Sequence, residues 1–272
     1  VARDLDTGER LWSRAFEYVF GETTPLLVER GDGHRVVIGA GESLRAFDGP
    51  TGERQWERRL DGIVRRAVAR AQASVYGAVY AATTGGELYA VDDEGRVRWN
   101  RTVDAGIRTA PTVVASRGPD GDSIRGSGDV VVGDGDGSVR CFDPNGSPQW
   151  HADLRGFVEG GIAAGHGGAF AASGGRLYAL NAEDGSHAWQ TGIGNAVRPT
   201  PPAVVGDTVY VGGERLRGVG VDGGVGFRSV RVGGTRFGRE VDGGASYVTA
   251  ADGRLFASVA TGTGGGRLGV LS

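Results

Sequence analysis

Short apolar runs alternate with glycine-rich polar turns along the whole chain, and the runs are too short for helices. The clearest unit has TPLLV at 24–28, RVVIGA at 35–40, SLRAFD at 43–48 and RQWER at 54–58. Runs of this kind, rich in β-branched residues and punctuated by Gly and Asp, are typical of strands joined by tight turns. No segment of useful length has the helical period of about 3.6 residues. The pattern therefore predicts an all-β protein built from four-stranded units.

A motif of a small residue, Asp, a polar turn, Gly and Trp recurs along the chain and defines the repeat. It reads AFDGPTGERQW at 46–56, and every Trp of the chain occupies the same place in a copy, four positions after a Gly. These residues are Trp12, Trp56, Trp99, Trp150 and Trp189. Their separations of 44, 43, 51 and 39 residues indicate a propeller blade or a solenoid unit. Two weaker copies follow, one with Phe227 in the place of Trp and one near Ala257 without an aromatic residue.

Each predicted sheet has two apolar faces, and both need neighbours. Radial packing of the sheets about an axis buries both faces and leaves only short edges. We therefore predict a β-propeller of four-stranded antiparallel blades, with seven blades or, as the alternative, eight, in a single domain over 1–272. Residues 1–16 match only the back half of a blade, so we expect the domain to begin inside a blade, with an N-terminal portion missing.

The repeated Trp and Asp residues have structural explanations in this fold. An indole between two sheets buries on the order of 200 Å² and can donate its N–H to a backbone carbonyl of the neighbouring sheet. The Asp at the end of the third strand can accept hydrogen bonds from the backbone N–H groups of the turn that follows. We therefore assign the five tryptophans to structure and predict no catalytic residue among them.

Composition excludes several classes of function. Glycine makes up 52 of 272 residues, which many tight turns would explain. The net charge is −3 and the positive charge is spread through the repeats, so nucleic-acid binding has no electrostatic support. Cys141 is the only cysteine and stands in the small-residue place of its motif, which favours a buried structural role and excludes an intrachain disulfide. No apolar run approaches the roughly 20 residues of a membrane span.

One place near the start of the first strand is charged in six successive units. Counted three residues before the Pro position, it holds Glu22, Arg65, Arg108, Glu159, Arg198 and Arg236. The first strand of a propeller blade is innermost, so these side chains are predicted to form a ring at one mouth of the central channel. The ring is net positive, and Arg binds carboxylates and phosphates through paired hydrogen bonds, so it is a candidate site for an anionic small ligand or an acidic peptide. The alternative is that the charges neutralise one another and bind only water.

Aspartates concentrate in the long fourth unit. An insertion at 116–128, expected to be a surface loop, and the turn after the next strand contain Asp120, Asp122, Asp129, Asp134 and Asp136. Alternating acidic oxygens in a Gly-containing loop can bind calcium, although the spacing is incomplete and no bidentate Glu closes it. Turn formation by Asp-Gly pairs is the alternative explanation. The four histidines are scattered, and no catalytic triad order or phosphate-binding loop is present.

The motif A-x-D-x-x-x-G-x-x-x-W, complete at Ala46, Asp48, Gly52 and Trp56, resembles the tryptophan-docking motif of the PQQ-repeat propellers. That group includes quinoprotein alcohol dehydrogenases and the lipoprotein propeller of the bacterial outer-membrane assembly machinery, and the resemblance covers essentially the whole chain. The dehydrogenase branch has adjacent disulfide-bonded cysteines, a calcium site and a catalytic Asp on a much longer chain. A single cysteine cannot form that disulfide. The resemblance therefore implies the non-enzymatic branch, without a PQQ cofactor.

Our first interpretation is a non-catalytic PQQ-like repeat propeller that acts as a protein-binding or assembly scaffold. We expect a protein or peptide partner on one face or at the channel mouth. The resemblance implies an extracytoplasmic location, periplasmic or at the cell surface. Two alternatives stay open, which are a PQQ-dependent dehydrogenase domain and the sensor domain of a larger surface or membrane protein.

Overall fold

The computed structural model contains strands and turns, and no helix, in the part of the chain that it describes, which confirms the all-β prediction. The described residues are 1–4, 6–16, 23–30, 33–64, 69–70, 79–117, 124–194, 201–212, 215–222, 226–227, 230–231, 235–240, 245–251, 254–261 and 265–271. They form two compact units. Unit 1 comprises Val1–Pro111 with Pro144–Gly146, and unit 2 comprises Thr112–Asp143 with Ser147–Ser272. The single-domain organisation and the blade count stay predictions.

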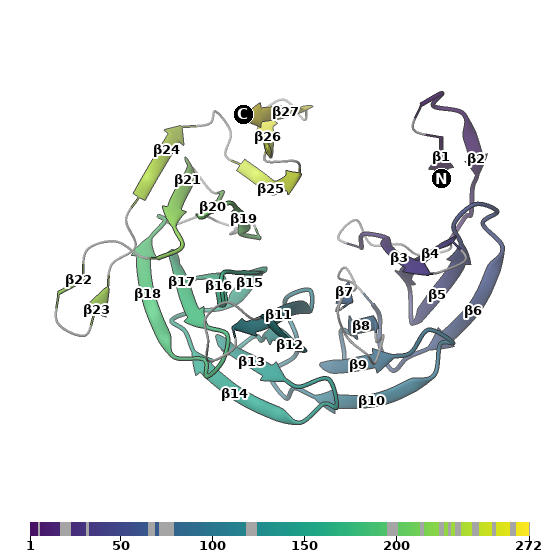
Figure 1. The fold of residues 1–272 in the computed structure, drawn as a ribbon, viewed down its shortest axis with the longest axis horizontal. Coiled ribbons are helices and arrows are strands. Elements are labelled where there is room, and N and C mark those ends of the chain that lie inside the picture. Colours follow the sequence, from purple (N-terminus) through teal and green to yellow (C-terminus); the bar gives the residue numbers. More distant parts are fainter. Residues whose placement is uncertain are drawn as a thin grey trace. The chain divides into compact units, whose positions relative to one another are not determined.

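Unit 1 contains one two-stranded and two four-stranded antiparallel sheets, in which consecutive strands are hydrogen-bonded neighbours (Figure 1). The first sheet pairs β1 (Ala2–Arg3) with β2 (Arg10–Trp12), which is the back half of a unit expected at this end. The second sheet contains β3 (Leu26–Arg30), β4 (Gly33–Ala40), β5 (Ser43–Asp48) and β6 (Arg54–Arg59). The third contains β7 (Ala69–Arg70), β8 (Val79–Ala82), β9 (Glu87–Val91) and β10 (Val97–Thr102).

Unit 2 continues the same order in three four-stranded sheets. The fourth sheet contains β11 (Thr112–Arg117), β12 (Ile124–Gly133), β13 (Ser138–Phe142) and β14 (Pro148–Asp153). The fifth contains β15 (Val158–Gly165), β16 (Gly168–Ser173), β17 (Arg176–Asn181) and β18 (His187–Gly192). The sixth contains β19 (Ala203–Val205), β20 (Thr208–Val211), β21 (Arg215–Gly220) and β24 (Thr235–Glu240). A hairpin of β22 (Gly226–Phe227) and β23 (Val230–Arg231) and a last sheet of β25 (Ala245–Ala251), β26 (Arg254–Thr261) and β27 (Gly265–Leu271) complete it.

The two described ends of the insertion in the fourth sheet are strand rather than loop. Ser116 pairs with Arg125 and Arg117 with Ile124, so β11 and β12 run on as a long antiparallel hairpin. The expectation of a surface loop over 116–128 was wrong at its two ends, because backbone pairing continues past the point where the apolar alternation stops. Only 118–123 lie outside the described residues.

The sixth sheet corrects the position of its aromatic residue. In the earlier copies the small residue of the motif pairs with Trp across the third and fourth strands, as Ala46 does with Trp56. In the sixth sheet Gly218 pairs in this way with Phe237 of β24, and Phe227 belongs to the inserted hairpin β22–β23. The prediction for Phe227 was wrong, because spacing along the chain cannot reveal a hairpin inserted between the two strands.

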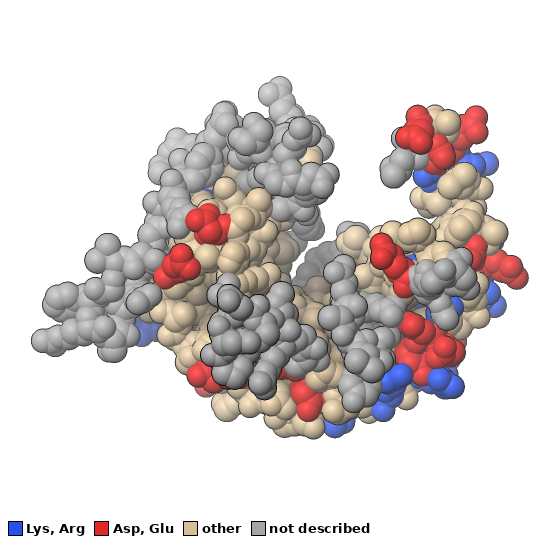
Figure 2. Space-filling view, viewed as in Figure 1, with Lys and Arg blue, Asp and Glu red and all other residues tan. Residues whose placement is uncertain are grey.

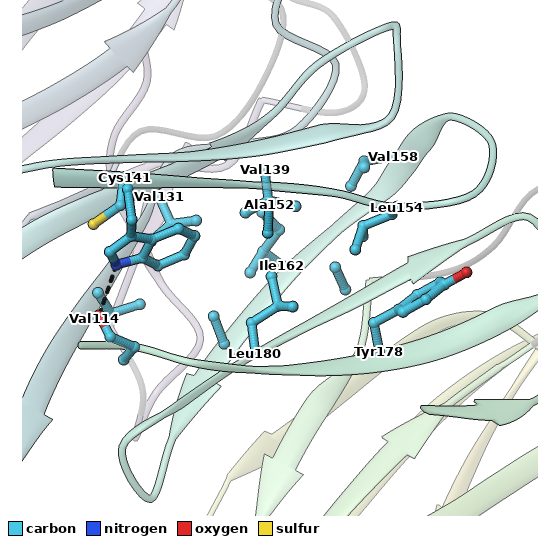
Figure 3. Close-up of a cluster of buried hydrophobic side chains, with 14 residues drawn as sticks. Val114, Val131, Val139, Cys141, Ala152, Leu154, Val158, Ile162, Tyr178 and Leu180 are labelled. Carbon is cyan, nitrogen blue, oxygen red and sulfur yellow. Dashed lines mark hydrogen bonds between the residues drawn. The ribbon is translucent and has the colours of Figure 1, made fainter. Parts of the chain in front are cut away.

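The core of unit 2 lies between the faces of consecutive sheets. Figure 3 shows Cys141 of the fourth sheet on the opposite side of one buried cluster from Leu180 and Tyr178 of the fifth. On its other face, the fifth sheet packs Trp189 against Val209 of the sixth. Both faces of the fifth sheet are therefore buried, as the apolar pattern predicts. Full burial of a side chain such as Leu180 contributes about 1.5–3 kcal/mol.

Candidate functional site

Each tryptophan joins its own sheet to the turn between the third and fourth strands of the next sheet. The indole Nε1–H of Trp12 donates to the carbonyl oxygen of Gly49 at 2.6 Å, and that of Trp56 donates to Asp93 at 2.8 Å. The remaining bonds are Trp99 to Pro144 at 2.8 Å, Trp150 to Ala182 at 2.9 Å and Trp189 to Val221 at 2.9 Å. This is the contact between neighbouring sheets that the sequence analysis expects. It gives each indole N–H a structural hydrogen bond.

The motif glycine is the surface on which the indole of the preceding sheet rests. Gly52, Gly95, Gly146 and Gly185 have positive φ angles between 67° and 80°. A Cβ added at any of them would lie 2.5–2.8 Å from a ring carbon of the preceding Trp. Only glycine therefore satisfies both the backbone and the space at this position. The repeat pattern identifies this glycine but does not reveal that it packs against the Trp of the preceding copy.

The motif aspartate is engaged by its own turn. The Oδ1 atom of Asp48 accepts hydrogen bonds from the side chain of Thr51 at 2.6 Å and from its backbone N–H at 2.9 Å. These two bonds hold the pKa of Asp48 below its usual value, the side-chain bond having the larger effect. Asn181 occupies the same place in the fifth sheet and accepts from the Glu183 N–H at 3.1 Å. The motif aspartates therefore shape turns, as predicted.

The predicted ring of charged residues is placed only in part. Arg108 is exposed just before β11, and the backbone of Glu159 lies in the first strand of the fifth sheet. Arg236 lies in β24, the fourth strand of the sixth sheet, so its assignment to a first strand was wrong for the same reason as that of Phe227. Glu22, Arg65 and Arg198 lie outside the described residues. The ring therefore stays a prediction.

The five aspartates proposed for calcium are not gathered into a site in the described part of the chain. Asp120 and Asp122 fall outside that part, Asp129 is half-buried in β12, and Asp136 is exposed. Asp134 is fully buried and its carboxylate is occupied. Its Oδ1 accepts from the N–H groups of Asp136 at 3.1 Å and Ser138 at 2.8 Å, and its Oδ2 pairs with Arg140 at 3.2 Å. No group of three or more His, Cys, Asp or Glu side chains that could hold a metal occurs among the described residues.

Cys141 is fully buried, as its place in the motif predicts. Burial, reinforced by the nearby carboxylates of Asp129 and Asp143, raises the pKa of the thiol. The thiolate needed for nucleophilic or metal chemistry is therefore disfavoured.

On the described part of the face shown in Figure 2, the acidic and basic residues of unit 1 form small neighbouring groups of opposite sign.

Two crossovers between sheets form corners with one exposed charged residue each, and the sequence analysis did not predict them. One is Leu60–Asp61–Gly62–Ile63–Val64, which leads into the third sheet, and the other is Leu154–Arg155–Gly156–Phe157–Val158, which leads into the fifth. In each, a tyrosine hydroxyl from the following sheet accepts the N–H of the second residue, from Asp61 to Tyr89 at 3.3 Å and from Arg155 to Tyr178 at 3.4 Å. The shared pattern Leu-x-Gly-x-Val, four residues after a Trp, is the signal that could have revealed them.

Antiparallel sheets that follow one another along the chain, with tryptophan hydrogen bonds from the first sheet through to the sixth, define a β-sheet repeat protein. A family model described as "Outer membrane protein assembly factor BamB" matches residues 1–134 and 135–228. The chain belongs to this family, and the resemblance found in the motif is confirmed.

The solved structures agree on the fold. The crystal structure of BamB from Moraxella catarrhalis is similar over 92% of this chain and 82% of that chain, with a TM-score of 0.60 and 17% sequence identity. A search of curated proteins finds no match. Within the described residues, no helix is long and apolar enough to cross a membrane.

Proposed function

We propose that the chain is a non-catalytic β-propeller that acts as a protein-binding or assembly scaffold outside the cytoplasm. The observation that carries this proposal is the match of the assembly-factor family model to residues 1–134 and 135–228. The chemistry of the described residues supports it. The indoles are bonded to neighbouring sheets, the motif aspartates to their turns, and the cysteine is buried with a raised pKa, so none of them is available as a reacting group.

The scaffold proposal is tested by capture of a partner. The tagged chain is expressed in its source cells, crosslinked briefly and purified from the extracytoplasmic fraction, and the captured proteins are quantified by mass spectrometry. We expect one protein to be enriched in near-equal amount with the chain. Absence of any enriched protein, together with a bound chromophore after addition of PQQ and calcium, would favour the dehydrogenase alternative instead.

The ring of charged side chains is our candidate for an anionic contact. Arg108 is exposed, and Arg198 holds the equivalent position in the repeat. We propose that Arg108 binds a carboxylate of an acidic peptide or a small anion, and that Arg198 makes the equivalent contact in its own repeat. Arg108→Ala combined with Arg198→Ala should weaken binding of an acidic probe peptide measured by calorimetry, and unchanged affinity would remove this site.

A further inference from the structure

The third-sheet corner (residues 60–64) and the fifth-sheet corner (residues 154–158) have the same backbone construction. Leu60 N–H donates to the carbonyl of Glu42 at 2.8 Å, and Leu154 N–H donates to that of Gly137 at 2.9 Å. The central glycines, Gly62 and Gly156, have φ angles of 94° and 87°. Both corners share these contacts and the tyrosine bonds described above, and in the third-sheet corner the Tyr89 hydroxyl also donates to Oδ2 of Asp61 at 3.4 Å.

The side chains of the two corners differ in sign and in size. The second residue is Asp61 in one corner and Arg155 in the other, and both are exposed. The fourth residue changes from the partly buried Ile63 to Phe157, which is 63% exposed. Because the third-sheet corner is built without them, the exposed ring and the positive charge are not requirements of the fold. An exposed Phe forgoes the stabilisation that burial of its ring would provide.

The first residue of the third strand also differs in charge between the two sheets. It is the acidic Glu87 in β9 of the third sheet and the basic Arg176 in β17 of the fifth. The carboxylate of Glu87 is occupied, because it accepts from Asn100 at 3.2 Å and from Thr102 at 2.7 Å on the neighbouring strand. Arg176 faces Gly192 in register, which offers no side chain to pair with.

The guanidinium groups of Arg155 in the fifth-sheet corner and of Arg176 in β17 are available to a ligand. In the described part of the chain, the exposed Arg155 and the partly buried Arg176 make no side-chain hydrogen bond or ion pair. The two arginines lie on neighbouring segments of the backbone, because the buried Ser173 Oγ donates to the carbonyl of Arg155 at 2.9 Å and to that of Gly156 at 2.8 Å. The crossover therefore rests on the turn that leads into Arg176.

We propose that Arg155, Phe157 and Arg176 form a docking site for an acidic protein segment that carries an apolar side chain beside its carboxylates. Phe157 provides the apolar contact, and the two guanidiniums bind the carboxylates through charge-assisted hydrogen bonds. Aromatic and arginine side chains are the residues that dominate protein interfaces. This inference rests on the proposed scaffold function and names the chemistry of the partner.

The test uses two fluorescein-labelled peptides of equal length with the same Leu and Phe positions, one with Glu and one with Lys between them. Anisotropy titrations at low and physiological salt compare the full chain with Phe157→Ser and with Arg155→Ala/Arg176→Ala. We expect the Glu peptide to bind more tightly than the Lys peptide, and each variant to weaken it by roughly tenfold or more, the range of interface hot spots. Phe157→Leu, which keeps an apolar side chain, should retain most of the affinity.

The third-sheet corner supplies the matched controls. Ile63→Ser and Asp61→Ala lie outside the proposed site and should therefore leave the affinity for the Glu peptide within about twofold. A twofold change in affinity corresponds to less than about 0.5 kcal/mol. Equal binding of both peptides, unchanged affinity in the fifth-sheet variants, or an equal loss in the third-sheet variants would overturn the proposal. Thermal melts confirm that all variants are folded.

Capture experiments separate this inference from the proposed function. If the Arg155→Ala/Phe157→Ser/Arg176→Ala variant captures the same protein partner as the parent chain, the scaffold function stands and the docking site is wrong. If the parent chain captures no partner while the peptide titrations follow the expected order, the docking site stands and the scaffold function fails.

Discussion

Substitution of one motif glycine by alanine tests the coupling between neighbouring sheets. In Gly95→Ala, the new Cβ would meet two ring carbons of Trp56 at 2.8 Å, and the residue would keep a φ of 79°. The left-handed backbone costs about 1–2 kcal/mol for a residue with a Cβ, and overpacking against the indole costs a further 1–3 kcal/mol or so. We expect Gly95→Ala to lower the free energy of unfolding by about 2–5 kcal/mol.

Gly106→Ala is the matched control for the backbone part of this loss. Gly106 belongs to the same unit and has a φ of 71°, but a Cβ there would meet no heavy atom within 4 Å. It should therefore lose only the backbone contribution of about 1–2 kcal/mol. Placing Gly95→Ala in a Trp56→Ala background should remove the overpacking and leave the same backbone loss, which completes a double-mutant cycle.

Urea unfolding followed by tryptophan fluorescence and circular dichroism measures these differences, with the slope against urea compared among variants. The reasoning predicts a coupling energy of about 1–3 kcal/mol between Gly95 and Trp56. Equal losses in Gly95→Ala and Gly106→Ala, or a coupling energy near zero, would refute the claim that the indole rests on this glycine.

Two further predictions follow from pKa values. Cys141, buried and with a raised pKa, should not react with a thiol reagent at pH 8 until urea unfolds the chain, and rapid labelling of the native protein would contradict its placement. The pKa of Asp48 is lowered in the folded state, so its contribution to stability is present above the unfolded pKa of about 3.9 and is lost as the pH falls through the folded pKa. Asp48→Asn, which imitates the native Asn181, should therefore flatten the decline of melting temperature below about pH 4, and an unchanged decline would argue against the linkage.

The fold could be predicted from the sequence because its determinants are local. The motif at 46–56 predicts the end of one strand, a turn and the start of the next strand within one short stretch. Its recurrence along the chain predicts the succession of sheets without any long-range information. The error at Phe227 arose where that locality failed, since β22–β23 separates Gly218 from its true partner Phe237.

The candidate sites were harder to predict, because they depend on side-chain partners and on exposure, which the repeat pattern does not encode. Asp134 carries the kind of oxygen atoms that bind calcium, yet these atoms accept a hydrogen bond from Ser138 and form an ion pair with Arg140 of its own sheet. The exposure of Phe157 has no signature in an apolar pattern, which would place it in the core. The structure is needed to show that Ile63 is partly buried whereas Phe157, at the equivalent place, is exposed.

Because the indoles of Trp12, Trp56, Trp99 and Trp150 each rest on the glycine of the following copy, the repeats that hold Trp56, Trp99 and Trp150 each carry one half of two different joints. Duplication or loss of a whole repeat within the gene therefore brings or removes a matching pair of halves and leaves the other joints intact. Such changes in repeat number are accessible to evolution in a single step. The same property makes whole repeats, cut at equivalent positions, the natural modules for engineered variants of this chain.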